Sequence, residues 1–223
     1  MRRIALAVAG VLVMAFLADQ TMQRSRIDDF VKLMDRDPVA AAGQLAASAD
    51  RDCRRGTADA EIFSLARALF AVETLARSRS EAIAERAITR TFLAFGGTGP
   101  DLSVGEGQVR ISTLRKALAA IPASERPAGG DFHDAVRALF ERCRALDLAV
   151  LIIRHHVNVR PAGDALLPRG EILRVARFWN GQTQPQSREA FIAARRYQEL
   201  VYHTFMALRF RSSLKVRRSE HSS

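Results

Sequence analysis

One acidic residue, Glu73, lies on or at the edge of the apolar face of a predicted helix. The segment 61-EIFSLARALFAVETLARS-78 repeats apolar residues at helical spacing, and Glu73 follows Phe70 by three residues and Leu69 by four. An unpartnered carboxylate in such surroundings is costly, so it must gain partners or have a raised pKa. A raised carboxyl pKa is what a general acid requires near neutral pH. The pattern therefore predicts acid–base chemistry at Glu73.

A glycine-containing turn, 103-SVGEGQV-109, follows Glu73 by about thirty residues and leads directly into another predicted helix. The preceding loop, 96-GGTGPDL-102, is also rich in glycine, and glycine lets a backbone approach a ligand closely. Two interpretations stay open for this segment. It is either an ordinary turn that caps the following helix or a place where the backbone approaches a ligand.

A helix with one catalytic Glu, followed by Ser-x-Gly-x-x-Gln-hydrophobic, resembles the lysozyme-like superfamily. The closest branch is that of the goose-type lysozymes and the lytic transglycosylases, which cleave peptidoglycan. Further along, 176-ARFWNGQ-182 and Tyr197 are similar to the Ala-x-x-aromatic-Asn-Gly segment and the late Tyr of that family. The resemblance covers roughly residues 60–210, and it rests on the order and spacing of short motifs.

The resemblance implies a glycan cleft with Glu73 as its single acid/base and with no cofactor or metal. In that family one Glu protonates the leaving glycosidic oxygen and then acts as base while the sugar's 6-hydroxyl closes on the anomeric carbon. Ser103 is then expected near Glu73, while Gln108 is expected to face the cleft or to brace the loop. The residues expected to bind substrate are Ser103, Gly105, Gln108, Trp179, Asn180 and Tyr197.

A second carboxylate would be needed for ordinary two-carboxylate glycoside hydrolysis. Asp101 and Glu106 are the candidates, but neither has the helical setting of Glu73, and Glu106 departs from the apolar or small residue usual in the family. This asymmetry favours the lytic-transglycosylase type. Trp179, the only Trp, suits sugar stacking beside Asn180, or equally a buried Trp at a helix that stops at Gly181.

Composition and periodicity predict an all-α fold, because aliphatic residues and Ala dominate while Trp and Tyr are scarce. In the helix predicted over 80–95, apolar positions such as Ile83 and Ile88, with Ala87 and Leu93, are expected to face inward. Glu81 and Glu85 are expected on a solvated face with neighbouring arginines. Ser78 and Glu81 have the spacing of a capping box at the start of this helix, and Thr57 or Asp59 is expected to cap the helix that carries Glu73. The other predicted helices are a pair over 24–50 broken at Asp37-Pro38, then 112–121, 132–158 with the central core segment 148–153, 171–181 and 187–211.

The N-terminus predicts export, since Arg2 and Arg3 precede an apolar run over residues 4–18. Cleavage of a signal peptide and an uncleaved inner-membrane anchor both stay open, although the run is short for a span of about 20 residues. Either alternative places the rest of the chain in the periplasm or outside the cell. The predicted organisation is a leader or anchor at 1–20, a helical extension and link at 21–56, the lysozyme-like domain at 57–211 and a frayed basic tail at 212–223.

The chain carries 34 Lys and Arg against 24 Asp and Glu, a formal charge of +10, which suits anionic partners. No nucleic-acid motif occurs, and the partner that the resemblance implies is peptidoglycan. Cys53 and Cys143 are expected either as one disulfide or as two buried thiols, and the sequence has no metal-binding pattern. Two rival functions remain: a glycan-binding structural protein that does not cut, and a membrane-anchored interaction protein in which Glu73 pairs with Arg77.

Overall fold

The computed structural model describes residues 2–49, 53, 60–94, 101, 103–126, 131–159, 166–181 and 187–220. The side chains of residues 2–13, 15, 76, 79, 188–190 and 212–220 lie outside this description. Most of the glycine-rich loop predicted at 96–102, and the helix cap predicted at Thr57 or Asp59, also lie outside the described residues.

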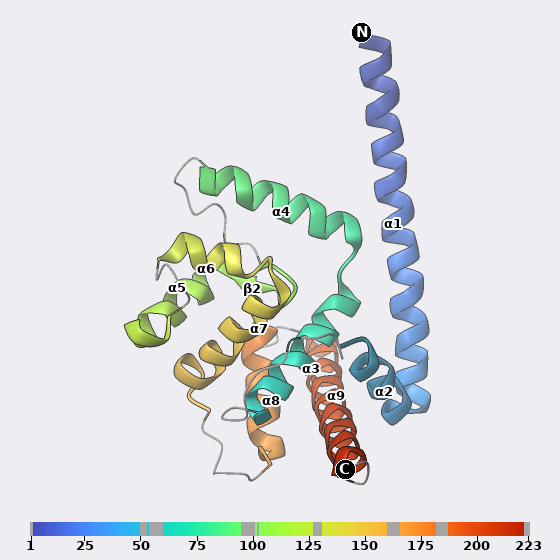
Figure 1. Ribbon diagram of the computed structural model, residues 1–223. Coiled ribbons are helices and arrows are strands. Elements are labelled where there is room, and N and C mark those ends of the chain that lie inside the picture. The colour runs from blue at the N-terminus through green and yellow to red at the C-terminus, as the bar shows by residue number, and fades with distance from the viewer. Residues whose placement is uncertain are drawn as a thin grey trace.

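The described residues form nine α-helices and one two-stranded hairpin, so the predicted all-α fold is confirmed (Figure 1). The helices are α1 (Arg2–Arg36), α2 (Pro38–Ala49), α3 (Ala60–Ala76), α4 (Arg79–Ala94), α5 (Ile111–Ala120), α6 (Phe132–Ala138), α7 (Arg142–Leu151), α8 (Arg169–Trp179) and α9 (Arg188–Glu220). The hairpin strands are β1 (Ser103–Val104) and β2 (Val109–Arg110), and short helical turns cover Ala123–Glu125 and Ile152–His156.

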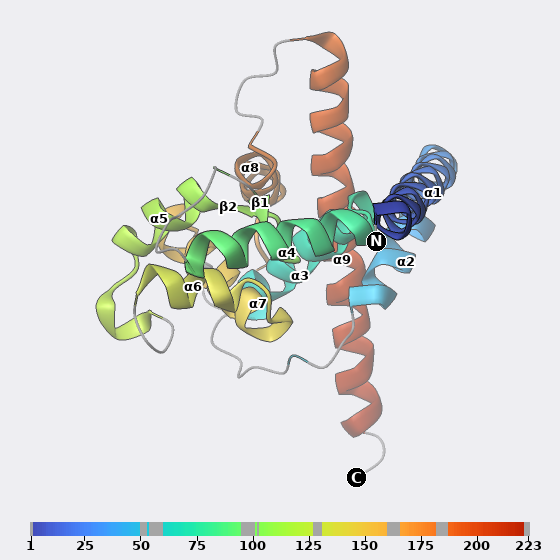
Figure 2. The ribbon, with the colours of Figure 1, turned by 90° about the horizontal axis from the view of Figure 1, so that it is seen from above.

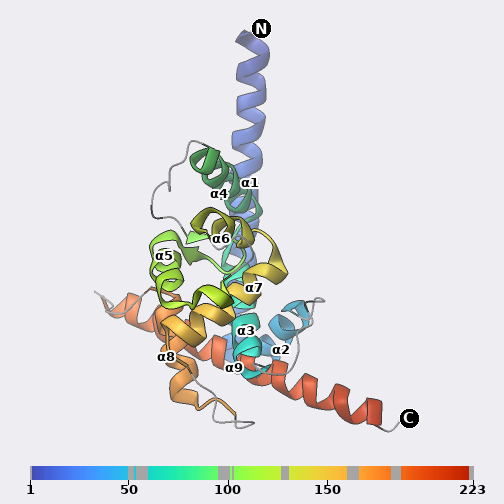
Figure 3. The same cartoon turned by 60° about the vertical axis from the view of Figure 1, so that its left-hand side comes forward.

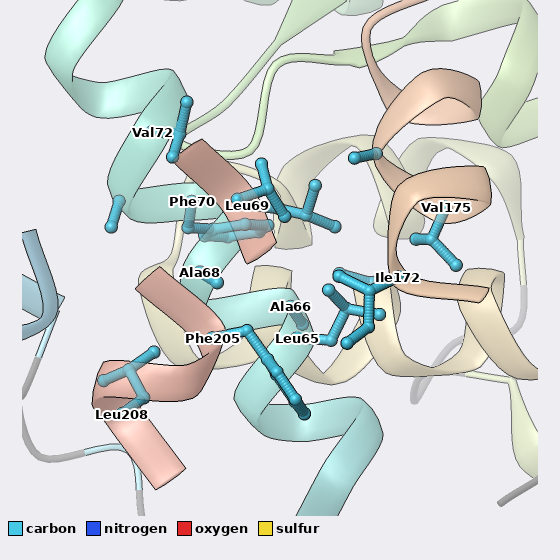
Figure 4. Packing of buried hydrophobic residues seen from close by; sticks show 14 of the residues in the cluster. Leu65, Ala66, Ala68, Leu69, Phe70, Val72, Ile172, Val175, Phe205 and Leu208 are labelled. Carbon is cyan, nitrogen blue, oxygen red and sulfur yellow. The ribbon is translucent and has the colours of Figure 1, made fainter. Parts of the chain in front are cut away.

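Helix α3 is the centre of the larger hydrophobic core and packs against α2, α7, α8 and α9. Its apolar face is fully buried because Ile62, Leu65, Leu69 and Phe70 recur at helical spacing. The close-up in Figure 4 shows side chains of α3 among those of α8 and α9. The labelled residues are Leu65, Ala66, Ala68, Leu69, Phe70, Val72, Ile172, Val175, Phe205 and Leu208.

A second hydrophobic cluster lies under the hairpin and joins it to α5, α6 and the end of α7. Val104 and Val109, one from each strand, are buried in it together with Leu114 of α5. Phe178 and Trp179 at the end of α8 pack against both clusters. The hairpin is therefore held on a packed base next to α3.

The predicted break at Asp37-Pro38 is confirmed, because α1 ends at Arg36 and α2 begins at Pro38. The Asp37 carboxylate accepts a hydrogen bond from the Ala40 amide at 2.9 Å, which caps α2. The backbone of α1 is continuous through residue 20, and its N-terminal half extends beyond the other helices (Figures 1 and 3). Most side chains of the predicted leader or anchor at 4–18 are not described; among those that are, Met14, Phe16 and Leu17 are exposed. No helix long and apolar enough to cross a membrane occurs among the residues that the structure describes.

The single helix predicted over 132–158 is wrong. The chain turns at Leu139 and Phe140 between α6 and α7, and Glu141 has extended backbone angles. This turn brings Leu139 against Gly105 of the hairpin, a contact between distant segments that local periodicity does not encode. The segment 148–153 is buried, as predicted for a central core segment.

The inward face predicted for the helix over 80–95 is also wrong. Ile83 is 64% exposed and Ile88 is 43% exposed, and Ala87 is exposed too, while Leu93 is partly buried. Helix α4 contacts α1 and β1 and few other described elements, so these positions stay largely uncovered. The capping box predicted from Ser78 to Glu81 is confirmed by hydrogen bonds in both directions, at 3.0 and 3.1 Å.

Of the two alternatives for the cysteines, the structure has the disulfide between Cys53 and Cys143, with Cα atoms 5.3 Å apart. It joins the connection between α2 and α3 to the start of α7. Helix α2, within the predicted extension, packs on the larger core, since Ala41, Leu45 and Ala46 belong to it. The tail differs from the prediction because α9 continues as a helix to Glu220.

Candidate active site

Glu73 lies in the last turns of α3, at the edge of its buried face, as its spacing predicts. The hydroxyl of Tyr197, which α9 brings across the core, donates a hydrogen bond of 2.6 Å to Glu73 Oε1. Burial raises the pKa of Glu73 to about 7, although the Tyr197 hydrogen bond lowers it. Burial and the neighbouring Glu73 carboxylate raise the pKa of Tyr197 well above its ordinary value, so Tyr197 stays a donor. Glu73 therefore holds its proton in part at neutral pH.

A comparison with Glu61, a second buried acid on α3, shows what is unusual about Glu73. Glu61 forms a salt bridge of 2.5 Å with Arg209, so its charge is balanced. Among the described residues, Glu73 receives its hydrogen bond from the neutral Tyr197 and forms no salt bridge. Arg77, the partner that the rival interaction hypothesis assigned to Glu73, pairs with Glu85 instead. An acid kept without a cation partner at the edge of a core, with a raised pKa, is a frequent mark of a functional group.

The hairpin next to α3 contains the predicted Ser103–Gln108 turn. Ser103 pairs with Arg110 and Val104 with Val109 in antiparallel register. Gly105 has φ +76°, and a Cβ at that position would overlap the Leu139 carbonyl oxygen, so only glycine fits. Gln108 also has a positive φ of 51°. The segment is therefore a tight hairpin turn rather than a simple cap of α5.

Arg77 and Glu85 tie this turn to α3. The Glu85 carboxylate accepts hydrogen bonds from the Gly105 amide at 2.6 Å and from Gln108 Nε2 at 3.2 Å. Arg77 donates to the Gly105 carbonyl at 2.8 Å and forms a salt bridge with Glu85. Gln108 thus braces the loop, one of its two predicted roles. Burial raises the pKa of Glu85, and its donors, Arg77 first, oppose that shift.

The solvated face predicted for Glu85 is wrong, since its side chain is 11% exposed and that of Arg77 is 12% exposed. Both residues hold the hairpin turn in place, a role that sequence reasoning missed. Arg77 lies between α3 and α4 while Glu85 lies within α4, so helical spacing does not pair them. A tight glycine turn leaves backbone amides that need an acceptor when they are buried. That need is the signal in the sequence that could have pointed to these residues.

We expect Glu85→Ala to lower the free energy of unfolding by about 2 kcal/mol. The substitution leaves Arg77 without its salt-bridge partner and the Gly105 amide without an acceptor. The loss of stability is smaller than for a fully buried ion pair, because both side chains are slightly exposed. Urea unfolding of the variant and the wild type measures the difference. Glu171→Ala, which breaks an exposed pair with Arg174, is the matched control and should change stability by less than about 0.5 kcal/mol. Equal losses for both variants would contradict a special role for Glu85.

Trp179 and Phe70 contact the turn at Gly107 and hold it in place. Trp179 Nε1 donates a hydrogen bond of 2.6 Å to the Gly107 carbonyl oxygen. The Trp179 and Phe70 rings lie 6.4 Å apart, and a Cβ on Gly107 would overlap the Phe70 ring. Because Phe70 is one turn before Glu73 in α3, this contact fixes the hairpin relative to Glu73. Trp179 is a partly buried packing residue here, which matches the second of its two predicted roles.

The other residues predicted for the site, Asn180, Ser103 and Asp101, have different surroundings. Asn180 is the residue that ends α8, and Gly181 follows with φ +68°, as expected for a helix-terminal glycine. Ser103 lies in β1, and among the described residues Glu73 has its hydrogen bond from Tyr197 rather than from Ser103 or Asn180. Asp101 accepts two hydrogen bonds from Ser112 at 2.8 and 2.9 Å, which lower its pKa and cap α5.

Glu106, the other candidate for a second carboxylate, forms a salt bridge with Arg142. Glu73 is therefore the carboxyl group of this region that keeps a raised pKa without a cation partner. A hollow of about 390 Å³ opens beside the turn and is lined by Arg77, Gly105 and Glu106 together with residues of α4. Glu73 lies one turn before Arg77. No cluster of three metal-binding side chains occurs among the described residues.

Comparison of this chain with protein-family models, with curated proteins and with solved structures finds no match.

Proposed function

We propose that this protein is an exported enzyme of the lytic-transglycosylase type, which cleaves the MurNAc–GlcNAc bond of peptidoglycan with Glu73 as its single acid/base. The observation that carries the proposal is a carboxyl group whose pKa is raised to about 7 and whose hydrogen-bond donor is the Tyr197 hydroxyl. A group that is protonated in part at neutral pH can give up a proton and take one back. The clamped glycine hairpin beside α3 agrees with the motif order of the lysozyme-like superfamily.

In the first step, protonated Glu73 donates its proton to the glycosidic oxygen as the bond from the anomeric carbon to that oxygen breaks. The oxygen leaves as a sugar hydroxyl, and positive charge develops on the anomeric carbon. The acetamido group of the substrate shares this charge. Tyr197 donates to Oε1 of Glu73, so it holds the carboxyl group in one orientation.

In the second step, the Glu73 carboxylate takes the proton from the 6-hydroxyl of the same sugar. The 6-oxygen bonds to the anomeric carbon and gives a 1,6-anhydro end. The proton returns to Glu73, so the cycle consumes no water and needs no second carboxylate. This fits a region in which Asp101 and Glu106 are engaged by Ser112 and Arg142.

Three features support an extracytoplasmic location. Arg2 and Arg3 precede the apolar run over residues 4–18, a pattern typical of exported chains. The Cys53–Cys143 disulfide suits an oxidising compartment. The net charge of +10 suits an anionic wall polymer.

The proposal is tested by digesting purified peptidoglycan with the full chain and analysing the released muropeptides by mass spectrometry. We expect products with 1,6-anhydro ends, which are lighter by one water than the reducing ends that a hydrolase makes. Reducing ends alone would show hydrolysis and overturn the transglycosylase mechanism. No release, combined with retained binding to the polymer, would favour a glycan-binding protein that does not cut.

We expect Tyr197→Phe to change the pH dependence of kcat/KM. Activity in the first step needs protonated Glu73, so kcat/KM of the wild type should fall as pH rises through about 7. Removing the hydroxyl removes the hydrogen bond that lowers the pKa of Glu73, so this fall should move to higher pH by about one unit. Tyr202→Phe, five residues along α9, is the control and should leave the profile unchanged. An unshifted profile for Tyr197→Phe would contradict the role given to this hydrogen bond.

A further inference from the structure

An arginine-rich groove runs along α4 beside the hairpin. Two hollows, of about 390 and 620 Å³, adjoin because both are lined by Arg86, Arg90 and Phe140. Figures 1 and 2 show α4 passing over the hairpin and α6. We call this continuous feature the arginine groove and define it by Arg77, Arg86, Arg90, Arg137, Ile83 and Phe140. Hollows of this size are typical of ligand sites.

The charges in the groove are not balanced. Arg77 pairs with Glu85 and Arg137 with Asp134, so two of its four arginines are matched. Arg86 lies 5.4 Å above the Phe140 ring and close enough to Glu85 to lower its pKa, but it forms no salt bridge among the described residues. Arg90 likewise has no acidic partner within the part of the chain that the structure describes.

The two glutamates that line the groove do not compensate Arg86 and Arg90. Glu106 is engaged by Arg142 and Glu141 by Arg144. Arg86 donates one long hydrogen bond, of 3.5 Å, to the Phe140 carbonyl oxygen, but neither Arg86 nor Arg90 pairs with an acid among the described residues. These two exposed guanidinium groups, one helical turn apart on α4, can therefore bind an anion. Guanidinium groups bind carboxylates through paired hydrogen bonds.

The apolar surface of the groove specifies the ligand further. Ile83 is 64% exposed, and Phe140 and Ala87 lie next to it along the groove. An extended ligand that alternates carboxylates with small apolar side chains would match this surface. A neutral sugar chain would leave the two arginines unmatched.

We propose that the arginine groove binds the peptide stems of peptidoglycan, through their carboxylates on Arg86 and Arg90 and their alanine methyl groups on Ile83 and Phe140. This inference rests on the proposed substrate, because a glycan held at the hairpin would carry its stems beside α4. The groove begins at Gly105 and at Arg77, which follows Glu73 by four residues, so stem binding and glycan cleavage would use neighbouring segments of the chain. The enzyme would then prefer strands that still carry peptides.

The test uses the full chain with Glu73→Gln, so that binding is measured without cleavage. The probes are the disaccharide that carries a tetrapeptide stem and neutral chitotriose, titrated by calorimetry. We expect the stem-bearing probe to bind more tightly than chitotriose. Adding Arg86→Ala and Arg90→Ala should weaken its binding roughly tenfold, with binding of chitotriose unchanged. Arg24→Ala with Arg26→Ala, two exposed arginines on α1, is the control of equal charge and should leave both affinities unchanged.

Unchanged binding of the stem-bearing probe by Arg86→Ala/Arg90→Ala would overturn the inference, as would equal affinity for chitotriose. Binding to vesicles of anionic phospholipid that needs Arg86 and Arg90, with no stem binding, would overturn it in favour of a membrane surface. The outcome is separable from that of the proposed function. Anhydro products without stem binding would overturn this inference and leave the proposed function intact. Stem binding without any cleavage by the wild type would overturn the proposed enzymatic activity and leave this inference intact.

Discussion

Replacing Glu73 by Gln is expected to lower the rate of peptidoglycan cleavage by about 10²- to 10⁴-fold and, at pH 8, to make the protein more stable. The rate falls because the amide can neither donate nor accept the proton that the reaction needs. Stability rises because the amide has no charge to bury, while its oxygen can still accept the hydrogen bond from Tyr197. A residue that reduces stability and supports activity is typical of an active site.

The pH dependence of this stability change follows from the pKa of Glu73. Its pKa is about 7 in the folded chain against an ordinary 4.5 when unfolded. Below pH 4.5 both states hold the proton, so the wild type is not penalised. Between pH 4.5 and 7 the unfolded state loses its proton first, so the wild type loses stability as pH rises. Above pH 7 the full penalty, about 2 to 3 kcal/mol, is present and Glu73→Gln removes it.

Urea unfolding of both proteins at pH 4 and pH 8, with a turbidity assay of peptidoglycan clearing, measures the two effects. The difference in stability should be near zero at pH 4 and large at pH 8. Glu171→Gln, at an exposed pair with Arg174, is the control and should change neither clearing nor the pH dependence of stability. If Glu73→Gln keeps wild-type activity, or is less stable than the wild type at pH 8, Glu73 is a structural residue and the proposed function fails.

The features of this site that could be predicted from the sequence are those encoded within one short segment of the chain. Glu73 could be found because helical periodicity shows which face of a segment is buried, and α3 follows its periodicity closely. The helix-terminal Gly181 and the capping box from Ser78 to Glu81 are also local, and both were predicted. The fold class followed from composition and from these segments together.

The errors came from contacts between distant segments. Glu85 reads as a surface residue from its own helix, yet it is buried because Gly105 and Arg77 meet it in space. The helix predicted over 132–158 is interrupted where Leu139 meets the hairpin. Apolar residues such as Ile83 are exposed because α4 lies at the border of the fold with few partners. Periodicity identifies an apolar face, but it does not say whether another element covers it.

The Cys53–Cys143 disulfide is expected to supply about 4 kcal/mol of the free energy of unfolding. It closes a loop across a sequence separation of 90 residues, and in the loop-entropy account a crosslink of that span stabilises by roughly this amount. Replacing both cysteines by serine should therefore lower the midpoint of urea unfolding strongly. Treating the wild type with a reductant should produce the same loss, and it should not affect the double variant. A loss below about 1 kcal/mol in either experiment would contradict this role.

The Cys53–Cys143 disulfide makes the stability of the fold depend on the compartment in which the protein resides. It ties the connection before α3 to the start of α7, and α3 and α7 pack together in the core that holds Glu73. A chain confined to a reducing compartment would lose this stabilisation while still bearing the penalty of its buried acid. Glu73→Gln should therefore partly restore the stability of the cysteine-free variant at pH 8, because the two effects are independent. Failure of that rescue would show that removing the disulfide had already opened the surroundings of Glu73 to water.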